Sequence, residues 1–345
     1  MYVGLTEIEK TASQAAKYTE GLKRGGQFDE NNLEVTISSE LQSILKDVKS
    51  FGDIYINTSP FTLQVKAGRK DQAQYLVHTI PRLEQIKPSM LRQLTIPKDM
   101  QPIDILACRI LPDGKYLILD SHISQSHLLL FSNEGMFMRE VVTFTRYSPD
   151  TCFVRNNTVA VTLGLEKQTA LVDVEKNKII KTIDLSHVCD GVASDNQMLV
   201  ISSMKKSTIV NLNDDSNTIL KGILANCVAF FKGNIYGSIC KENKVCCYKS
   251  TGETLWTFMH HDIEKPGQLT LDKNGFVYIA SRGNYKIVVI SPDGKTCKTI
   301  LSEADGIKNN FAIDTNRATG MMIVSSEISI DSEDKSYETA FVYEI

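Results

Sequence analysis

Residues 265–301, KPGQLTLDKNGFVYIASRGNYKIVVISPDGKTCKTIL, contain four short runs of β-forming residues separated by polar turns. The runs cover 269–272, 276–280, 286–290 and 296–301. The sequences between them include Lys273-Asn274-Gly275 and Pro292-Asp293-Gly294, which are typical of tight turns. Runs of this length, rich in Val, Ile and aromatic residues, predict strands. The segment is therefore predicted to form one four-stranded antiparallel sheet.

Similar units recur through the second part of the chain. They begin at residues 108, 152, 192, 228, 269 and 311, so successive units are 44, 40, 36, 41 and 42 residues apart. Four strands in a repeat of about 40 residues are typical of the blade of a β-propeller. The sequence therefore predicts an all-β fold over residues 90–345, a β-propeller with six blades.

The sixth unit has only three clear strands, and the last of them, residues 340–344, is at the C-terminus. Residues 91–96 lie just before the first unit and are expected to supply the missing strand. Pairing of this segment with the C-terminal strand would close the ring. Closure would also remove an exposed sheet edge.

Two helices are expected before the propeller. The first follows the three- and four-residue spacing of a coiled coil, at Leu5, Ile8, Ala12, Ala15, Thr19 and Leu22. The second covers residues 39–50 and begins with a capping box of Ser39 and Gln42. Residues 1–52 are thus predicted to form a coiled-coil tail and an amphipathic helix, through which the chain would associate as a homodimer. Residues 53–89, which contain several prolines, are predicted to be a linker.

The composition is that of an ordinary folded protein, with 42% apolar and 23% charged residues. Lys and Arg number 38 and Asp and Glu 41, so the net charge of -3 favours neither a general polyanion binder nor an acidic tail. No run approaches the roughly 18 apolar residues of a membrane span, and residues 1–10 lack a secretory signal pattern. We therefore expect no membrane association, a cytoplasmic location and buried thiols at the eight cysteines.

Residues 265–295 resemble an NHL repeat. With a coiled-coil stretch before six such units, the chain as a whole resembles the C-terminal portion of the tripartite-motif (TRIM) NHL family. The resemblance implies a propeller that selects targets, whereas a RING domain transfers ubiquitin in that family. The cysteine and histidine clusters of the RING and B-box modules do not precede the coiled coil here, so ligase activity is not expected. WD40 and kelch repeats fit less well, because no Trp-Asp dipeptide occurs and the one double glycine, Gly25-Gly26, lies outside the repeats.

No catalytic, cofactor or metal site is predicted. Gly294-Lys295-Thr296 imitates the end of a phosphate-binding loop, but Val289 occupies the place of its first glycine. His260 and His261 are adjacent, and neighbouring side chains on a strand point to opposite faces, so no zinc site is assigned. A propeller hydrolase would need acidic residues and Asn clustered at the central channel, and the inner strands show no repeated acid set. We therefore expect that the chain is not an enzyme.

The turn between the second and third strands has the same place in every blade, so these turns are expected to share one rim. In the second to fifth units they carry seven basic residues and two acidic ones, Glu166 and Glu242, a net charge of +5. The loops between blades are expected to open on the same rim and to add groups able to contact phosphates or stack on bases, namely Arg146, Tyr147, His187, Asn226, His260 and His261. The predicted partner- or RNA-binding rim consists of Arg146, Tyr147, Lys167, Lys205, Lys206, Lys241, Lys244, Arg282 and Lys286.

The sixth unit reverses the sign of the charge at its equivalent turn, with Glu327, Asp331, Glu333 and Asp334 against Lys335. Lysines also occupy solvated turns that have no function, and that alternative stays open. The predicted function is a non-catalytic protein-interaction or target-recognition propeller, a substrate receptor in a ubiquitin pathway. The alternative is an RNA-binding propeller whose rim contacts phosphates through Arg and Lys and a base through Tyr147. A propeller hydrolase is the third.

Overall fold

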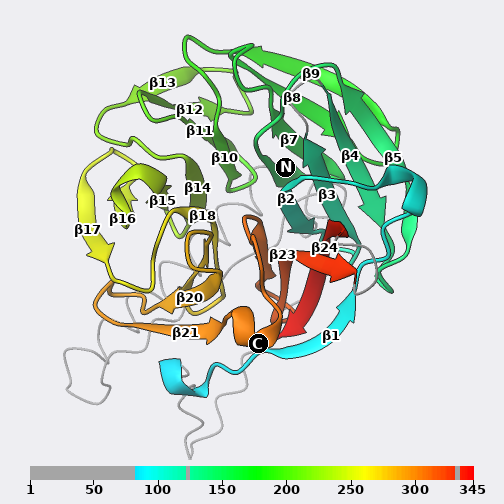
Figure 1. Cartoon of the computed structure of the whole chain (residues 1–345). Helices are drawn as coiled ribbons and strands as arrows, with labels where there is room; N and C mark the ends of the chain where they lie inside the picture. Colours follow the sequence, from blue (N-terminus) through cyan, green and yellow to red (C-terminus); the bar gives the residue numbers. More distant parts are fainter. Residues whose placement is uncertain (1–81, 122–124, 331–334) are drawn as a thin grey trace, which may run out of the picture. The chain divides into compact units, whose positions relative to one another are not determined.

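The computed structural model describes residues 82–121, 125–330 and 335–345. These residues form six four-stranded antiparallel sheets that surround a common axis as blades (Figure 1). In the described ranges the helical structure consists of four 3₁₀ turns, η1 (Leu83–Gln85), η2 (Lys98–Met100), η3 (Cys240–Glu242) and η4 (Glu303–Asp305). The predicted all-β propeller with six blades is confirmed. The helices predicted within 1–52 and most of the linker predicted over 53–89 lie outside the described residues.

The first five blades are each a continuous piece of chain that begins with the innermost strand. The first contains β2 (Ile105–Ile110), β3 (Tyr116–Ser121), β4 (Ser126–Phe131) and β5 (Phe137–Phe144). The second contains β6 (Thr151–Arg155), β7 (Thr158–Thr162), β8 (Gln168–Asp173) and β9 (Lys178–Asp184). The third contains β10 (Gly191–Ser194), β11 (Met198–Ser202), β12 (Ser207–Asn211) and β13 (Asn217–Leu220).

The fourth blade contains β14 (Cys227–Phe231), β15 (Asn234–Ile239), β16 (Lys244–Lys249) and β17 (Thr254–Met259). The fifth contains β18 (Pro266–Leu271), β19 (Val277–Ser281), β20 (Lys286–Ile290) and β21 (Cys297–Leu301). The sixth blade contains β22 (Ile313–Asn316), β23 (Met321–Ile330) and β24 (Lys335–Glu344), with β1 (Ser89–Gln93) as its outermost strand.

The first turn of the fifth blade shows how the sequence produces a sheet. The Asp272 carboxylate accepts the N–H groups of Asn274 and Phe276, both at 2.9 Å. Gly275 has a φ of 90°, which glycine adopts without the steric cost that an L side chain meets. These contacts reverse the chain, so β19 pairs antiparallel with β18.

The ring closes where β1 pairs antiparallel with β24, with Ser89 opposite Glu344 and Gln93 opposite Phe341. The expected closing segment was 91–96, whereas β1 starts two residues earlier and ends at Gln93. The strand stops there because the next residues turn toward the first blade. Leu94 N–H still donates to Ala340 O at 2.9 Å, and Thr95 forms a parallel bridge with Met136 before β5. The segment therefore joins the last blade to the first.

Six apolar clusters form the core of the described residues, one between each pair of neighbouring blades. Strand β19 shows how one sheet supplies two of them. Val277 and Ile279 pack toward the fourth blade, while Tyr278 and Ala280 pack toward the sixth. Side chains alternate between the two faces of a strand, so a blade buried on both faces needs a nearly continuous apolar run.

Candidate functional site

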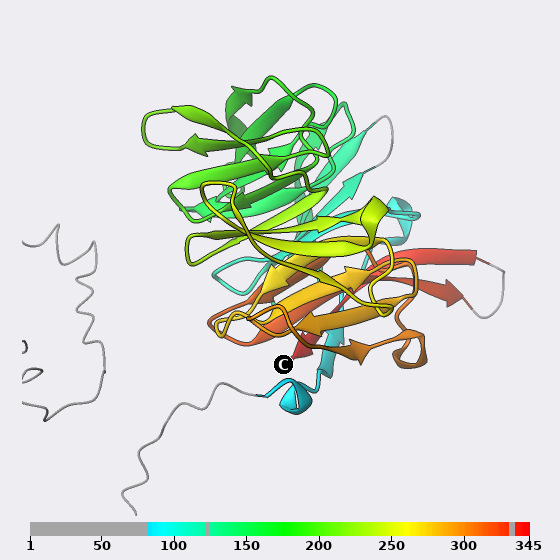
Figure 2. The ribbon, with the colours of Figure 1, turned by 90° about the vertical axis from the view of Figure 1, so that its left-hand side faces the viewer.

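The candidate site is one end of the propeller. Consecutive strands of a blade are antiparallel, so the turn after the second strand and the loop after the fourth strand lie at the same end. The described turns after the second strand are 163–167, 203–206, 240–243 and 282–285, and the loops between blades include 145–150, 221–226 and 260–265. We call this surface the rim. In Figure 2 the hairpin of β23 and β24, drawn in red, extends beyond the other blades.

Three basic side chains of the rim form ion pairs with carboxylates. The pairs are Arg146 Nε with Glu166 Oε1 at 3.1 Å, Lys244 Nζ with Glu242 Oε2 at 2.5 Å, and Lys286 with Asp262. The hydrogen bond from Lys286 holds the pKa of Asp262 below its usual value. Exposed pairs such as Arg146–Glu166 contribute at most about 1 kcal/mol. The positive charge counted along the sequence is therefore partly neutralised by neighbours in the fold.

The other basic side chains of the rim differ in whether they form hydrogen bonds within the protein. Lys206 Nζ donates to Ser186 Oγ at 2.7 Å, and Arg282 Nε donates to Asn309 Oδ1 at 3.2 Å. Of the nine predicted residues, Lys167, Lys205 and Lys241 are exposed bases whose side chains form neither an ion pair nor a hydrogen bond within the described residues. Among the predicted residues, these three are the charges most available to a partner.

Large apolar side chains are exposed among these charges. They are Tyr147 (42% exposed), Leu165 (80%), Leu224 (43%), Met259 (65%) and Tyr285 (38%). Only Tyr147 was predicted from the sequence. The other four were missed because the sequence search followed charge, although Leu165 stands between Gly164 and Glu166 in a polar turn and is visible there. Aromatic residues and Met interspersed with Arg are typical of protein-binding surfaces.

The sixth blade places two carboxyl groups opposite each other, Glu327 on β23 and Glu338 on β24. Glu338 accepts the N–H of Ile105 at 2.6 Å and the amide of Asn309 at 3.2 Å. Burial raises the pKa of Glu338 to about 7. The remaining acidic residues predicted for this end, Asp331, Glu333 and Asp334, lie outside the described residues.

The central channel is crossed by a polar network that was not predicted. Arg109 on β2 donates to Asp150 Oδ1 at 2.6 Å and to Gln268 Oε1 at 2.8 Å. Gln268 on β18 donates in turn to Asp150 Oδ1 at 2.6 Å. These residues belong to the first, fifth and second blades, and the fifth and second are not neighbours. The contacts therefore run across the middle of the ring.

The oxygens of Asp150, and of Asp314, a second buried acid that acts electrostatically on Arg109, are occupied by hydrogen bonds. Besides Arg109, Asp150 accepts the N–H groups of Thr151 at 2.8 Å and of Val192 at 2.9 Å. Burial raises the pKa of Asp150 to about 6, against the opposing effect of Arg109. Asp314 on β22 accepts the N–H of Ile110 at 2.9 Å. These carboxylates therefore hold backbone and side-chain groups of several blades together at the centre of the ring.

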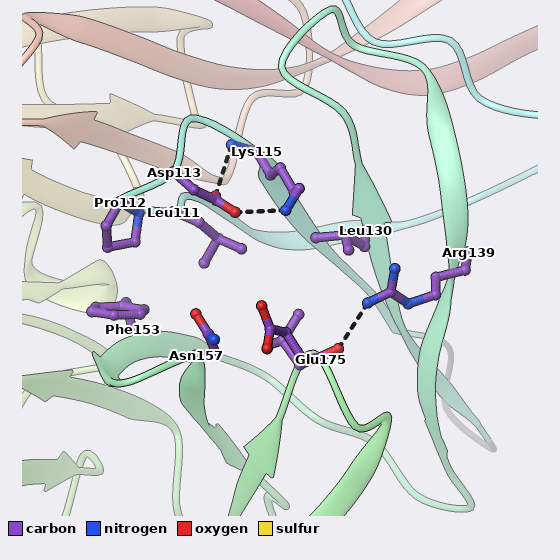
Figure 3. A pocket seen from close by; sticks show the side chains of 10 residues that line it. Leu111, Pro112, Asp113, Lys115, Leu130, Arg139, Phe153, Asn157 and Glu175 are labelled. Atoms are coloured by element: carbon purple, nitrogen blue, oxygen red, sulfur yellow. Dashed lines mark hydrogen bonds and ion pairs between the residues drawn. The ribbon is translucent and has the colours of Figure 1, made fainter.

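A small hollow opens on the opposite end of the molecule, between the first and second blades (Figure 3). Its volume is about 110 Å³, below the roughly 300–1,000 Å³ typical of a small-molecule site. Asp113 and Lys115 at its mouth bind each other at 2.6 Å, and Arg139 donates to Val174 O at 3.1 Å. Asp113, Lys115 and Arg139 are thus engaged within the protein.

All eight cysteines are free thiols, and six are buried as expected. The prediction is wrong for Cys240 and Cys297, which are half-buried. Cys297 lies at the beginning of the outermost strand of the fifth blade, where solvent reaches part of the side chain.

No protein-family model matches the sequence. One stretch of 79 residues is 25% identical to E3 ubiquitin-protein ligase TRIM56 from Mus musculus. It covers 22% of this chain and 11% of that protein, so the chain matches only a small part of this relative. Together with the six blades, the match supports a TRIM-like propeller. Among the described residues, no helix has the length and apolar character needed to cross a membrane.

Proposed function

We propose that this chain is a non-catalytic target-recognition module whose rim binds a partner protein. The observation that carries the proposal is the mixture of exposed apolar side chains with unpaired lysines on one end of the propeller. Propellers commonly serve as rigid platforms for protein partners, because their loops vary while the blades hold them in place. Leu165 and Met259, the most exposed apolar groups of the rim, would contribute buried area.

A protein partner agrees better with the rim than a polyanion does. Affinity for nucleic acid comes mainly from phosphates that neutralise Lys and Arg. Arg146, Lys244 and Lys286 are already paired with carboxylates, which reduces the charge that phosphates would meet. Leu165 and Leu224 can neither stack on bases nor bind phosphate. A partner segment with apolar anchors and acidic residues would use both kinds of group.

The role in a ubiquitin pathway rests on the resemblance to TRIM-NHL proteins and on the short match to a protein named as an E3 ubiquitin-protein ligase. We propose that this propeller would select the target and that a RING domain elsewhere would transfer ubiquitin. The chain would then act as a substrate receptor in the cytoplasm.

RNA binding is the second candidate. Tyr147 is exposed next to Arg146 in the loop 145–150, an arrangement suited to stacking on a base beside a phosphate. The unpaired lysines at 167, 205 and 241 would supply further phosphate contacts. A preference for RNA would appear as a steep salt dependence of affinity.

Two rim variants of the full chain separate these candidates. Leu224→Ser/Met259→Ser removes apolar area and leaves position 165 free for a label, and Lys167→Glu/Lys205→Glu/Lys241→Glu reverses the unpaired charges. A photo-cross-linking amino acid at position 165 is expected to capture a protein in cells in an RNase-resistant adduct. The same label at position 180, an exposed apolar position on the outermost strand β9, is the control.

Fluorescence anisotropy with single-stranded RNA across a salt series completes the test. Loss of protein capture in the serine variant, with weak RNA affinity, supports the protein-binding proposal. Tight RNA binding that the glutamate variant loses and the serine variant keeps would overturn it in favour of RNA. Equal capture at positions 165 and 180 would contradict the proposal that the rim is the binding surface.

A further inference from the structure

Three side chains that are commonly zinc ligands converge beside the rim. His260 and Asp262 lie in the loop 260–265 after β17, and Cys297 lies at the beginning of β21 in the next blade. One ligand atom from each lies within 4.8 Å of the others. Among residues 82–121, 125–330 and 335–345, this is the one group of three or more His, Cys, Asp or Glu placed in this way.

The two oxygens of Asp262 have different partners. Oδ1 accepts a hydrogen bond from Lys286, whereas Oδ2 lies 3.6 Å from His260 Nδ1. Ligand atoms at about 2.0–2.3 Å from a tetrahedral zinc ion are roughly 3.4–3.7 Å apart. The 3.6 Å between His260 Nδ1 and Asp262 Oδ2 matches this value, and the bound of 4.8 Å on the whole group exceeds it by about 1 Å, so small side-chain shifts would complete the site. Lys286 would remain on the outer oxygen, as hydrogen-bonded partners of metal ligands commonly do.

The His260 ring is held in position, and its Nδ1 atom is oriented to act as a metal ligand. Phe258 stacks on His260, with ring centroids 6.2 Å apart and an interplanar angle of 21°. The N–H of Asp262 donates to His260 Nδ1 at 3.2 Å, so this nitrogen has a lone pair, as metal binding requires. This long hydrogen bond would be exchanged for the metal bond.

An ion can reach the group from solvent. A hollow lined by Asn243, Met259, His261, Ile263 and Glu264 opens beside His260. The ring centroids of His261 and His260 are 4.0 Å apart, and the side chain of His261 is 81% exposed. A water molecule or His261 can therefore occupy the fourth position of a tetrahedral site.

We propose that His260, Asp262 and Cys297 bind a zinc ion that joins the loop between the fourth and fifth blades to β21. Nitrogen, carboxylate oxygen and thiolate sulfur are a donor set that suits zinc. Binding releases the proton of the Cys297 thiol to solvent, and the thiolate and the Asp262 carboxylate balance the two positive charges of the ion. Because loop 260–265 belongs to the rim, the site lies on the proposed binding surface, but ion binding does not require a partner to be bound there.

The test uses the full chain, treated with a chelator and kept reduced, and titrated with Co²⁺ as a spectroscopic substitute for Zn²⁺. We expect one equivalent to produce visible bands of a tetrahedral site and a near-ultraviolet band from the sulfur–cobalt bond. Zn²⁺ should displace Co²⁺ and raise the melting temperature, because an ion that binds only the folded state stabilises it. Cys297→Ser should abolish the sulfur band, and His260→Gln should weaken binding by about tenfold or more.

Cys240→Ser is the matched control, since Cys240 is the other half-buried thiol and lies outside the group. Far-ultraviolet circular dichroism verifies that each variant is folded. If Cys297→Ser does not fold, His260→Gln decides the result. The proposal is overturned if no stoichiometric sulfur–cobalt band appears, if the band persists in a folded Cys297→Ser or His260→Gln variant with unchanged affinity, or if Cys240→Ser removes it.

Discussion

Replacing Asp150 by Asn tests the network that crosses the central channel. The side chain of Asp150 is 2% exposed and that of Arg109 is 11% exposed. Oδ1 of Asp150 accepts from Arg109 and Gln268, while Oδ2 accepts the N–H of Val192 at 2.9 Å. Asparagine keeps the size of the side chain but removes the charge and replaces one oxygen by a donor. Arg109 would lose its closest counter-charge, and a buried N–H would lose its acceptor.

The expected cost is about 3 kcal/mol of the free energy of unfolding. Removing one partner of a buried ion pair costs about 3–5 kcal/mol, because the other charge stays buried without compensation. The lower end applies here, since Asp314 also acts electrostatically on Arg109 and raises its pKa. The measurement is urea unfolding of the full chain at pH 7.5, followed by the fluorescence of Trp256, the one tryptophan.

A double-mutant cycle decides whether the reasoning is correct. Arg109→Leu alone should cost a similar amount, while Arg109→Leu/Asp150→Asn should cost at least about 1 kcal/mol less than the sum of the two. Asp113→Asn, which breaks an exposed pair with Lys115, is the control and should cost less than about 1 kcal/mol. Single costs that add within about 0.5 kcal/mol would refute an ion pair across the channel.

Burial raises the pKa of Glu338 to about 7, so the folded state binds the proton more tightly than the unfolded state. The stability that this group contributes is fully present below its unfolded pKa and is lost as pH rises through about 7. The free energy of unfolding, measured with urea from pH 4 to 8, should therefore show a difference between wild type and Glu338→Gln that changes by up to about 3 kcal/mol over this range. Gly294→Ala should cost about 2 kcal/mol in thermal unfolding, because φ is 67° and the new Cβ would lie 2.5 Å from Trp256 Cδ2, whereas Gly306→Ala, with φ of 83° and open space, should cost less. Leu94→Ala should cost about 2–5 kcal/mol in urea unfolding, since this fully buried side chain packs between the sixth and first blades, and a cost below about 1 kcal/mol would contradict that role.

Most of the fold prediction rested on the repeat of about 40 residues. Alternating apolar residues and turn sequences such as Asp272-Lys-Asn-Gly act over a few positions, so their effect is visible in the chain itself. The need for a fourth strand in the sixth blade followed from counting strands. The end of β1 at Gln93 did not follow, because it depends on Thr95 meeting Met136 of another blade.

The candidate site was predicted less completely. The positions of the nine rim residues on turns and strand ends follow from the order of strands. Their availability does not, because Arg146, Lys244 and Lys286 are paired with carboxylates whose approach depends on loop conformation. The exposure of Leu224 and Met259 likewise depends on what the loops leave uncovered.

Sequence by itself determined the number of blades, the strand order and the end at which the loops gather, because each depends on local pattern repeated at a fixed period. Tertiary structure alone decided which distant side chains meet. Arg109, Asp150 and Gln268 come from three blades, and His260 and Cys297 come from two. The rule that adjacent residues point apart applies to a strand, whereas residues 260–265 form a loop in which His260 and Asp262 approach each other. Contacts of this kind depend on how the ring closes, which no single segment specifies.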